Sequence, residues 1–346
     1  MASSDPTGTS SLSSTVREIS LSQLESAPDT WLSEAAPWVL RDAVAEWPLV
    51  QAAKKSSASS LDYICRFYQG HKVSAFLGEP EINGRFFYNQ DFSGFNFLQV
   101  QTRLDQVIAK LQEMADASAS PSLYVGATNI AHWLPGMELE TQFVSPLPSP
   151  LASLWLGNET IVAPHFDYPA NIACCVLGAR RFTLFPPDQV KNLYIGPWDI
   201  TPAGQPISLV NTRDPDYDQH PLFREALINA LVTELEPGDA IYIPSLWWHQ
   251  VESTEKINGL VNFWWSNHPR EYGRPMDAFN HALLSIKTLP AAERNAWQTL
   301  FDYYVFSRQP SDRHRWKNDV IDRTENLNLE VAKKLRGELI NNLKQV

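Results

Sequence analysis

The chain has 346 residues, and its 28 Lys and Arg against 39 Asp and Glu give a formal net charge of −11. This length can bury a substantial core, whereas the acidic balance disfavours binding to the phosphate backbone of nucleic acid. Apolar residues make up 44% of the sequence, with 25 Pro and 12 Trp. This composition excludes an intrinsically disordered chain and favours a loop-rich β protein over a helical bundle.

The cysteines Cys65, Cys174 and Cys175 are too few, and two of them too close in sequence, to form a disulfide framework. They predict a reducing, cytoplasmic setting. The Ser- and Thr-rich start lacks the apolar segment of a signal peptide, and no stretch reaches 18 apolar residues. We therefore expect neither secretion nor a membrane span.

The first third of the chain has a mixed pattern. Residues 1–15 are predicted to be a disordered tail, followed by an α/β flank over residues 16–121. Within this flank the pattern predicts helices at 21–32, 61–68 and 97–114, and strands at 37–40 and 72–77. The helix at 97–114 rests on apolar residues at helical spacing, which are Leu98, Leu104, Val107, Ile108 and Leu111.

Residues 122–270 have a different character, because short apolar runs alternate with Pro, Gly, Asn and Asp. This is typical of a β-sandwich or β-barrel. The predicted strands lie at 123–125, 153–156, 172–176, 182–185, 240–243 and 260–265. From residue 271 onward the pattern becomes helical, at 276–286, 291–306 and 329–343, and we find no internal repeat.

The sharpest candidate for chemistry is His165-Phe166-Asp167. On a strand, side chains two residues apart point to the same face, so an imidazole and a carboxylate would converge. His249 follows in a second predicted strand. Two His and one carboxylate form the facial triad that suits non-haem Fe(II), although zinc uses similar sets. His-x-Asp alone is weak, because a His in a strand is more often a hydrogen-bonded structural residue.

Several further blocks accompany these residues in order. They are Trp155-Leu156-Gly157-Asn158, Pro164 to Asp167, Asn171, Gly178 to Asp188, Pro237-Gly238-Asp239, Trp247 to Ser253, Val261 to Trp264, and the upstream segment Pro37 to Pro48. Together they resemble the cupin-like/JmjC group of Fe(II)- and 2-oxoglutarate-dependent oxygenases, especially its asparaginyl-hydroxylase branch. The resemblance covers roughly residues 30–270.

This resemblance implies a mainly β fold, with a double-stranded β-helix (jelly-roll, cupin) core over residues 122–270 between the α/β flank and C-terminal helices. It also implies that His165, Asp167 and His249 hold Fe(II), and that 2-oxoglutarate binds as cosubstrate. The expected reaction is hydroxylation of a protein side chain or a small molecule.

The resemblance further implies residues around the cosubstrate, which are Arg180, Tyr124, Asn171, Asn262 and Trp264. Arg180 stands where the family has a Lys, and a guanidinium can bind a carboxylate bidentately. Val162 stands where the family often has a hydroxyl residue, so one hydrogen bond to the cosubstrate would be missing. Each of these residues could instead be a core or strand-end residue.

The substrate end carries less information. The Arg-Gln pair that the peptide hydroxylases present is absent, since the corresponding stretch reads Gly204-Gln205-Pro206-Ile207-Ser208. Arg85 and Tyr88 lie where the family places a mobile lip, and Trp247 is expected near the mouth. All three are candidate substrate-binding residues, with a buried strand as the alternative for the first two.

Two other functions stay open at this point. One is a metal-binding cupin without turnover, which acts as a sensor or a ligand-binding module, and the other is zinc-dependent hydrolysis. In the C-terminal region, residues 271–346, the apolar residues Ala332, Leu335, Leu339 and Leu343 recur on one helical face, which favours assembly. The resemblance implies that this assembly is a homodimer, since a C-terminal helical pair forms one in that family. The alternative is packing of this helix against its own chain.

Overall fold

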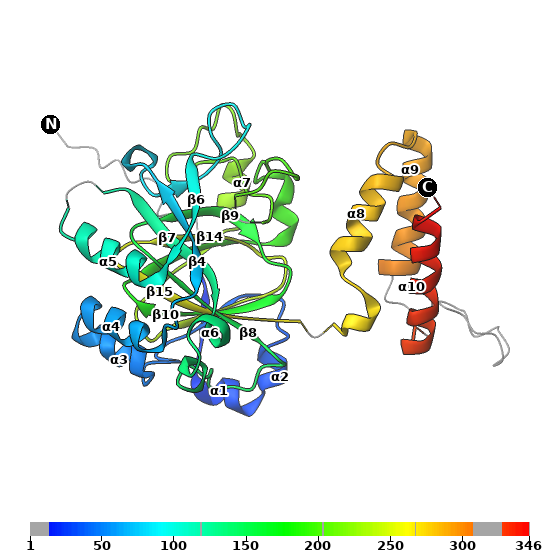
Figure 1. The fold of residues 1–346 in the computed structure, drawn as a ribbon. Coiled ribbons are helices and arrows are strands. Elements are labelled where there is room, and N and C mark those ends of the chain that lie inside the picture. The colour runs from blue at the N-terminus through cyan, green and yellow to red at the C-terminus, as the bar shows by residue number, and fades with distance from the viewer. Residues whose placement is uncertain (1–13, 118–119, 203, 267, 307–326, 346) are drawn as a thin grey trace. The chain divides into compact units, whose positions relative to one another are not determined.

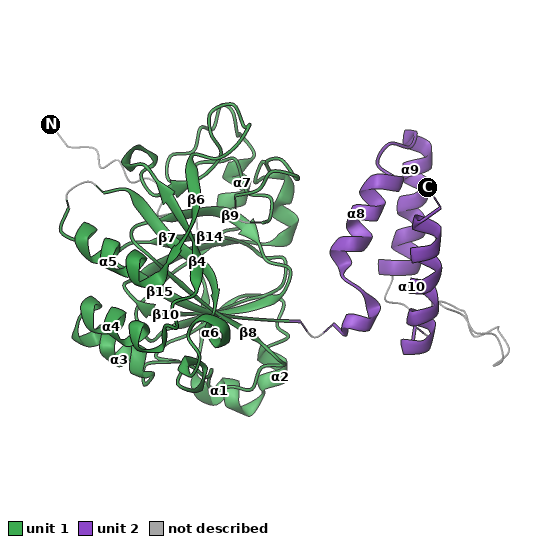
Figure 2. Ribbon diagram, viewed as in Figure 1, with its two compact units in different colours: residues 1–265 green, residues 266–346 purple. Residues whose placement is uncertain are grey.

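The computed structural model describes residues 14–117, 120–202, 204–266, 268–306 and 327–345 (Figure 1). The chain divides into two compact units, residues 1–265 and residues 266–346 (Figure 2). The first unit contains the predicted flank and the predicted core as far as residue 265. The second contains the C-terminal helices, and each unit is described by itself below.

Two β-sheets form the first unit. The six-stranded sheet has the order β1-β12-β11-β14-β9-β5. Its strands are β1 (Ser14–Thr15), β12 (Leu231–Leu235), β11 (Arg180–Phe185), β14 (Trp248–Ser253), β9 (Ile161–Phe166) and β5 (Arg85–Phe86).

The nine-stranded sheet has the order β2-β3-β13-β10-β15-β8-β7-β4-β6. Its strands are β2 (Arg17–Ile19), β3 (Trp38–Leu40), β13 (Ala240–Ile243), β10 (Ala170–Leu177), β15 (Asn258–Trp265), β8 (Leu151–Gly157), β7 (Ser122–Asn129), β4 (Lys72–Gly78) and β6 (Phe97–Arg103).

Strands β8 to β15 form the predicted jelly-roll. Along the chain they alternate between the two sheets, except that β11 and β12 both belong to the six-stranded sheet. The order β12-β11-β14-β9 faces β13-β10-β15-β8, and strands from the flank extend the larger sheet at both ends. This topology confirms the predicted fold class and brings segments about 80 residues apart into direct pairing, such as β9 with β14.

Strand β10 shows how the two sides of the larger sheet are filled. Ala173 and Cys175 are fully buried between the two sheets, where they pack with Phe182 and Leu184 of β11. The alternate residues of β10 pack on the other side against the flank helices. A strand covered on both faces reads as a continuous apolar run, which explains the sequence of residues 172–177.

The flank helices form the outer cover of the larger sheet. The helices of the first unit are α1 (Leu21–Ser26), α2 (Pro28–Trp31), α3 (Pro48–Lys55), α4 (Ser57–Phe67), α5 (Leu104–Met114), α6 (Ile130–Trp133) and α7 (Phe223–Ile228). Ser20 and Ser56 cap α1 and α4 by accepting hydrogen bonds from backbone N–H groups of the first turn. The predicted helices at 21–32 and 61–68 thus correspond to α1–α2 and α4.

The predicted helix at 97–114 is wrong in its first part. Residues 97–103 form strand β6, which pairs with β4 in a continuous antiparallel register, and only Leu104–Met114 are helical. Phe97, Leu98 and Val100 favour a strand, and pairing with β4 outweighs the helical spacing of Leu98 with the later residues. The side chain of Gln106 accepts a hydrogen bond from the Arg103 backbone N–H and marks the start of α5.

The two ends of the chain complete the description. Residues 1–13 of the predicted tail lie outside the described residues, and Ser14 and Thr15 pair in parallel with Leu231 and Val232. The second unit contains the helices α8 (Pro275–Ser285), α9 (Ala291–Phe301) and α10 (Leu329–Leu343), close to the predicted ranges. No helix within the described ranges is long and apolar enough to cross a membrane.

Candidate metal centre

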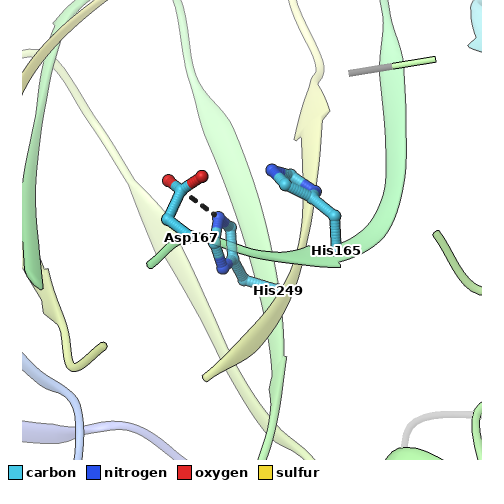
Figure 3. Close-up of side chains that lie close together, drawn as sticks. All are labelled: His165, Asp167 and His249. Carbon is cyan, nitrogen blue, oxygen red and sulfur yellow. Dashed lines mark ion pairs between the residues drawn. The ribbon is translucent and has the colours of Figure 1, made fainter. Parts of the chain in front are cut away.

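Three side chains converge at the end of β9 and the start of β14 (Figure 3). His165 on β9 pairs directly with His249 on β14, and Asp167 follows two residues after His165. One ligand atom from each of the three lies within 4.8 Å of the others. Asp167 Oδ2 is 3.8 Å from His249 Nε2. The geometry brings together the three residues predicted as metal ligands.

Backbone contacts fix the orientation of both imidazoles. His165 Nδ1 is 3.0 Å from the Ala163 carbonyl, and His249 Nδ1 is 2.9 Å from the Trp247 carbonyl. A carbonyl can only accept, so Nδ1 carries the proton on both rings and Nε2 keeps its lone pair for a metal. Burial, together with nearby His165, lowers the pKa of His249 to about 4, which keeps this ring neutral.

A tryptophan holds the carboxylate ligand. Trp264 on β15 donates its indole N–H to Asp167 Oδ2 at 3.0 Å. Metal-binding carboxylates are commonly oriented by such outer contacts. Trp264 is predicted to lie beside the cosubstrate, and in the structure it directly contacts a candidate metal ligand.

The predicted amides also meet. Asn262 Nδ2 donates to Asn171 Oδ1 at 2.9 Å, across the neighbouring strands β15 and β10. Both residues are buried, and Asn262 Oδ1 has no hydrogen-bond partner among the described residues. An unpaired buried acceptor beside the candidate ligands favours a bound molecule or water there.

A buried cation lies at the other end of the interior. Arg180, the first residue of β11, is 7% exposed and donates from Nη1 to Ser253 Oγ at 2.9 Å. Its Nε has no hydrogen-bond partner within the part of the chain that the structure describes. Burial lowers the pKa of Arg180 to about 10, because no carboxylate offsets the lost hydration. A buried guanidinium with an open edge is an anion site by its chemistry.

Register relates this cation to the candidate ligands. Arg180 pairs with Ser253 of β14, and His249 stands four residues earlier on the same strand. At roughly 3.3 Å per residue the two strand positions are about 13 Å apart. With the side chains reaching inward, this separation suits an anion of several carbons that binds a metal with one end and Arg180 with the other.

Two further residues of this interior, Ser153 and Trp155, are not among the site residues predicted from the sequence. They lie two apart on β8, and both Ser153 Oγ and Trp155 Nε1 are buried without a hydrogen-bond partner among the described residues. The Trp155 ring lies between Tyr124, at 6.2 Å, and Trp264, at 6.1 Å between ring centroids. A Trp in an apolar strand normally indicates core, so only the fold reveals its unpaired indole N–H.

Tyr124 on β7 lies in the same region. It is 8% exposed, and its ring stacks on Phe76 with the centroids 4.7 Å apart. Burial raises the pKa of its hydroxyl. A neutral phenol at this position is a hydrogen-bond donor.

The three candidate substrate-binding residues are already bonded within the chain. Arg85 donates from Nη2 to the carbonyls of Leu209 and Val210, at 3.4 and 3.3 Å. The Tyr88 hydroxyl donates to the Ile200 carbonyl at 2.8 Å, and the Trp247 indole donates to the Ala35 carbonyl at 2.9 Å. These bonds favour a structural role for all three over the predicted contact with a substrate.

The donor set fits Fe(II). Two neutral imidazoles and one carboxylate on one side of an ion leave positions open on the other side, the arrangement of non-haem iron oxygenases. Of the described residues, only these three form a cluster of His, Cys, Asp or Glu that could hold a metal ion. The unpaired polar atoms of Arg180, Trp155 and Asn262 fit an additional polar ligand inside the same jelly-roll.

Comparison with known proteins agrees with this geometry. The chain is 32% identical over 129 residues to "Lysine-specific demethylase JMJ31" of Arabidopsis thaliana, covering 37% of this chain and 23% of that protein. It is 32% identical over 142 residues to "HSPB1-associated protein 1" of Homo sapiens, covering 40% and 28%. It is 33% identical over 145 residues to "tRNA wybutosine-synthesizing protein 5" of Mus musculus, covering 41% and 40%.

The matched stretch therefore spans less than half the length of each of these relatives. A family match covers far more of the present chain, since residues 25–271 match the family described as the cupin-like domain. This range includes the whole jelly-roll and all the candidate ligands. The chain belongs to the cupin-like domain family, and its similarity to JmjC proteins agrees with the resemblance seen in its sequence.

Proposed function

We propose that this protein is an Fe(II)- and 2-oxoglutarate-dependent oxygenase that hydroxylates a protein side chain or a small molecule. The observation that carries the proposal is the presence, inside one jelly-roll, of a two-His, one-Asp cluster and a buried guanidinium whose Nε has no hydrogen-bond partner among the described residues. A metal alone needs no such cation. A dicarboxylate needs both the metal, which it chelates with one end, and a cation, which binds the carboxylate at its other end.

The chain's own residues supply ligand geometry and a shaped interior. Nε2 of His165, Nε2 of His249 and a carboxylate oxygen of Asp167 would hold the metal, with Trp264 fixing the carboxylate. When bound, Fe(II) with 2-oxoglutarate and dioxygen supplies the oxidising power for C–H hydroxylation. The protein contributes position and exclusion of water, because His249, Asn171 and Asn262 are each no more than 5% exposed.

The interior donors would bind the cosubstrate. Arg180 can offer the Nε/Nη2 edge of its guanidinium to the distal carboxylate, since Nη1 is already bonded to Ser253. Tyr124 and Trp155 can donate from the opposite sheet. Val162 offers no hydroxyl on β9, and the unpaired Trp155 indole is a candidate for the missing donor.

The test is formation of succinate from 2-oxoglutarate by protein loaded anaerobically with Fe(II) and then exposed to oxygen. We expect succinate above the level of Zn(II)-loaded protein, which has the same ligands but no redox chemistry, detected by mass spectrometry. Stoichiometric Fe(II) binding with no succinate would instead favour a metal-binding cupin without turnover. Hydrolytic activity with Zn(II) that Fe(II) abolishes would favour the zinc alternative.

The substrate remains a class rather than a compound. The relatives' names point to a lysine demethylase and to tRNA wybutosine synthesis, so they do not agree on one substrate. A formal charge of −11 favours a protein or small molecule over a polyanion. Cys65, Cys174 and Cys175 are all free, which supports a cytoplasmic setting.

The second unit supports a homodimer. Within its described residues only Ala332 is a buried hydrophobic residue, so its helices have almost no core of their own. Large apolar side chains remain exposed on all three helices, namely Phe279, Leu284, Trp297, Leu300, Leu329, Leu339, Ile340 and Leu343. Exposed apolar side chains on helices favour an interface, and we propose that a second copy of the chain supplies the matching surface.

Replacing exposed apolar residues of α10 with charged ones should therefore dissociate the proposed dimer. Leu339 and Leu343 are 45% and 51% exposed, so Leu339→Glu with Leu343→Glu should leave the first unit folded and put like charges into the interface. We expect light scattering to give at least twice the 39.1 kDa chain mass for the parent chain and a lower mass for the variant. A parent chain that is monomeric at micromolar concentration would contradict this interface.

A further inference from the structure

Strand β6 is an edge strand whose outer side is open. It ends the nine-stranded sheet and pairs only with β4, through seven consecutive residue pairs without a register shift. Among the described residues, none donates to or accepts from the outward backbone groups of residues 98–102. A row of unpaired N–H and C=O groups is a template for another strand.

The usual devices that block such an edge are missing here. The sequence Phe97–Arg103 contains no Pro and no Lys, and no bulge interrupts its pairing. Its single charge is Arg103 at the end of the strand, where it forms an ion pair with Asp105. Natural proteins protect exposed edges explicitly, so an unprotected edge of this length indicates that a strand occupies it.

One face of β6 continues the apolar, core-facing side of the sheet past the part that the flank helices cover. Val100 stands opposite Ala75, and Thr102 stands opposite Val73, both of which are buried in the core beneath the flank helices. Cross-strand neighbours share a face, so Leu98 and Val100 continue this core-facing side. They are nevertheless 65% and 39% exposed, because the sheet ends there.

The residue pattern of β6 is self-complementary. Antiparallel pairing about a two-fold axis at Val100 uses the whole strand and places Leu98 opposite Thr102 of the second copy. It also places Gln99 opposite Gln101, and Phe97 opposite Arg103. No like charges face each other in this register, amide meets amide, and a guanidinium meets an aromatic ring.

We propose that β6 pairs with β6 of a second copy of this chain, antiparallel about Val100, and joins the two nine-stranded sheets into one. This contact is independent of the proposed oxygenase reaction. It is also distinct from the proposed helical interface, because the two surfaces belong to different units of the chain.

Cysteine cross-linking of the full chain tests both the contact and its register. In the proposed pairing Val100 faces its own copy, at a Cα separation suited to a disulfide. Two Gln99 residues are displaced by two residue steps, roughly 7 Å, along the strand in addition to the strand spacing, which is too far. Val100→Cys should therefore form a covalent dimer on mild oxidation, and Gln99→Cys should not.

Gln99→Cys is the matched control, since both residues are exposed on the same strand. The free cysteines of the parent chain are buried or half-buried and set the background. Equal cross-linking of both variants would indicate random collision, cross-linking of Gln99→Cys alone would indicate another register, and no cross-linking would indicate no contact. Each of these results overturns the proposal.

A second measurement does not depend on oxidation. Val100→Lys places two ammonium groups opposite each other, whereas Val100→Thr keeps a neutral strand former at the same exposed position. Sedimentation should show loss of a concentration-dependent association step for Val100→Lys and its retention for Val100→Thr, with circular dichroism unchanged. Identical sedimentation of both variants and the parent chain would overturn the proposal.

Discussion

Replacing Asp167 by Ala is expected to abolish Fe(II) binding at physiological concentrations and, with it, succinate formation. The variant removes the only carboxylate of the three-residue cluster and leaves its two imidazoles. Asp167 is 24% exposed in its side chain, so its removal leaves no buried cavity and the fold should persist. The expected loss of metal affinity exceeds about 100-fold, the upper end of what removal of an outer contact costs.

Trp264→Phe provides a graded control for this variant. It removes the hydrogen bond to Asp167 Oδ2 but keeps the carboxylate and an aromatic ring. We expect a loss of metal affinity of about 10- to 100-fold, between the parent chain and Asp167→Ala. The measurement is Mn(II) titration by calorimetry, which needs no turnover. Parent-like affinity in Asp167→Ala would contradict the assignment of the metal ligands.

Local patterns predicted most of what determines this site. Short apolar runs between Pro, Gly, Asn and Asp identified strands β7, β8, β10, β11, β13 and β15, and the spacing of His165 and Asp167 indicated a shared face. Short turns bound these strands, and burial on both faces gives them unambiguous apolar runs. The wrong assignment of residues 97–103 shows the limit of this reasoning. An edge strand with exposed polar residues on one face carries little apolar signal, and only pairing with β4 decides its structure.

The side-chain partners could not be predicted in the same way. The contact between Trp264 and Asp167 joins residues 97 positions apart, and it depends on the register of β15 beside β10. The open indole of Trp155 and the open guanidinium edge of Arg180 are properties of atoms rather than of residue types. Arg85, Tyr88 and Trp247 are predicted from the sequence to bind substrate, but their polar groups donate to backbone carbonyls of the same chain. No sequence pattern indicates these hydrogen bonds.

Replacing Arg180 is the second change with a large expected effect. Whether the replacement raises or lowers the melting temperature of the ligand-free protein distinguishes a ligand-binding role of Arg180 from a structural one. Removal of a buried polar side chain usually destabilises a protein, because its partners are left unpaired. Among the described residues no carboxylate forms an ion pair with Arg180, and Ser253, to which it donates, is also in contact with Thr160 Oγ1 at 3.2 Å. Arg180→Met removes an uncompensated buried charge, so the melting temperature of the ligand-free protein should stay constant or rise.

The same substitution should weaken binding of 2-oxoglutarate. A hydrogen bond to a charged group contributes about 1.5–3 kcal/mol, so loss of the guanidinium should reduce affinity about 10- to 150-fold. Calorimetry on the Mn(II)-loaded protein measures this directly, and thermal unfolding provides a second readout. Saturating 2-oxoglutarate should raise the melting temperature of the parent protein, since a ligand that binds only the folded state stabilises it, and should raise that of Arg180→Met much less.

Arg180→Lys separates charge from geometry in this pocket. An ammonium keeps the charge, but its three donors sit on one nitrogen and cannot form the two parallel hydrogen bonds of a guanidinium edge. We expect an affinity between those of the parent chain and Arg180→Met. If Arg180→Met instead lowers the melting temperature by several degrees and leaves the 2-oxoglutarate affinity intact, Arg180 is a structural residue. In that case the interior would have to bind another ligand beside the metal, because the buried Trp155 and Asn262 atoms would still lack partners.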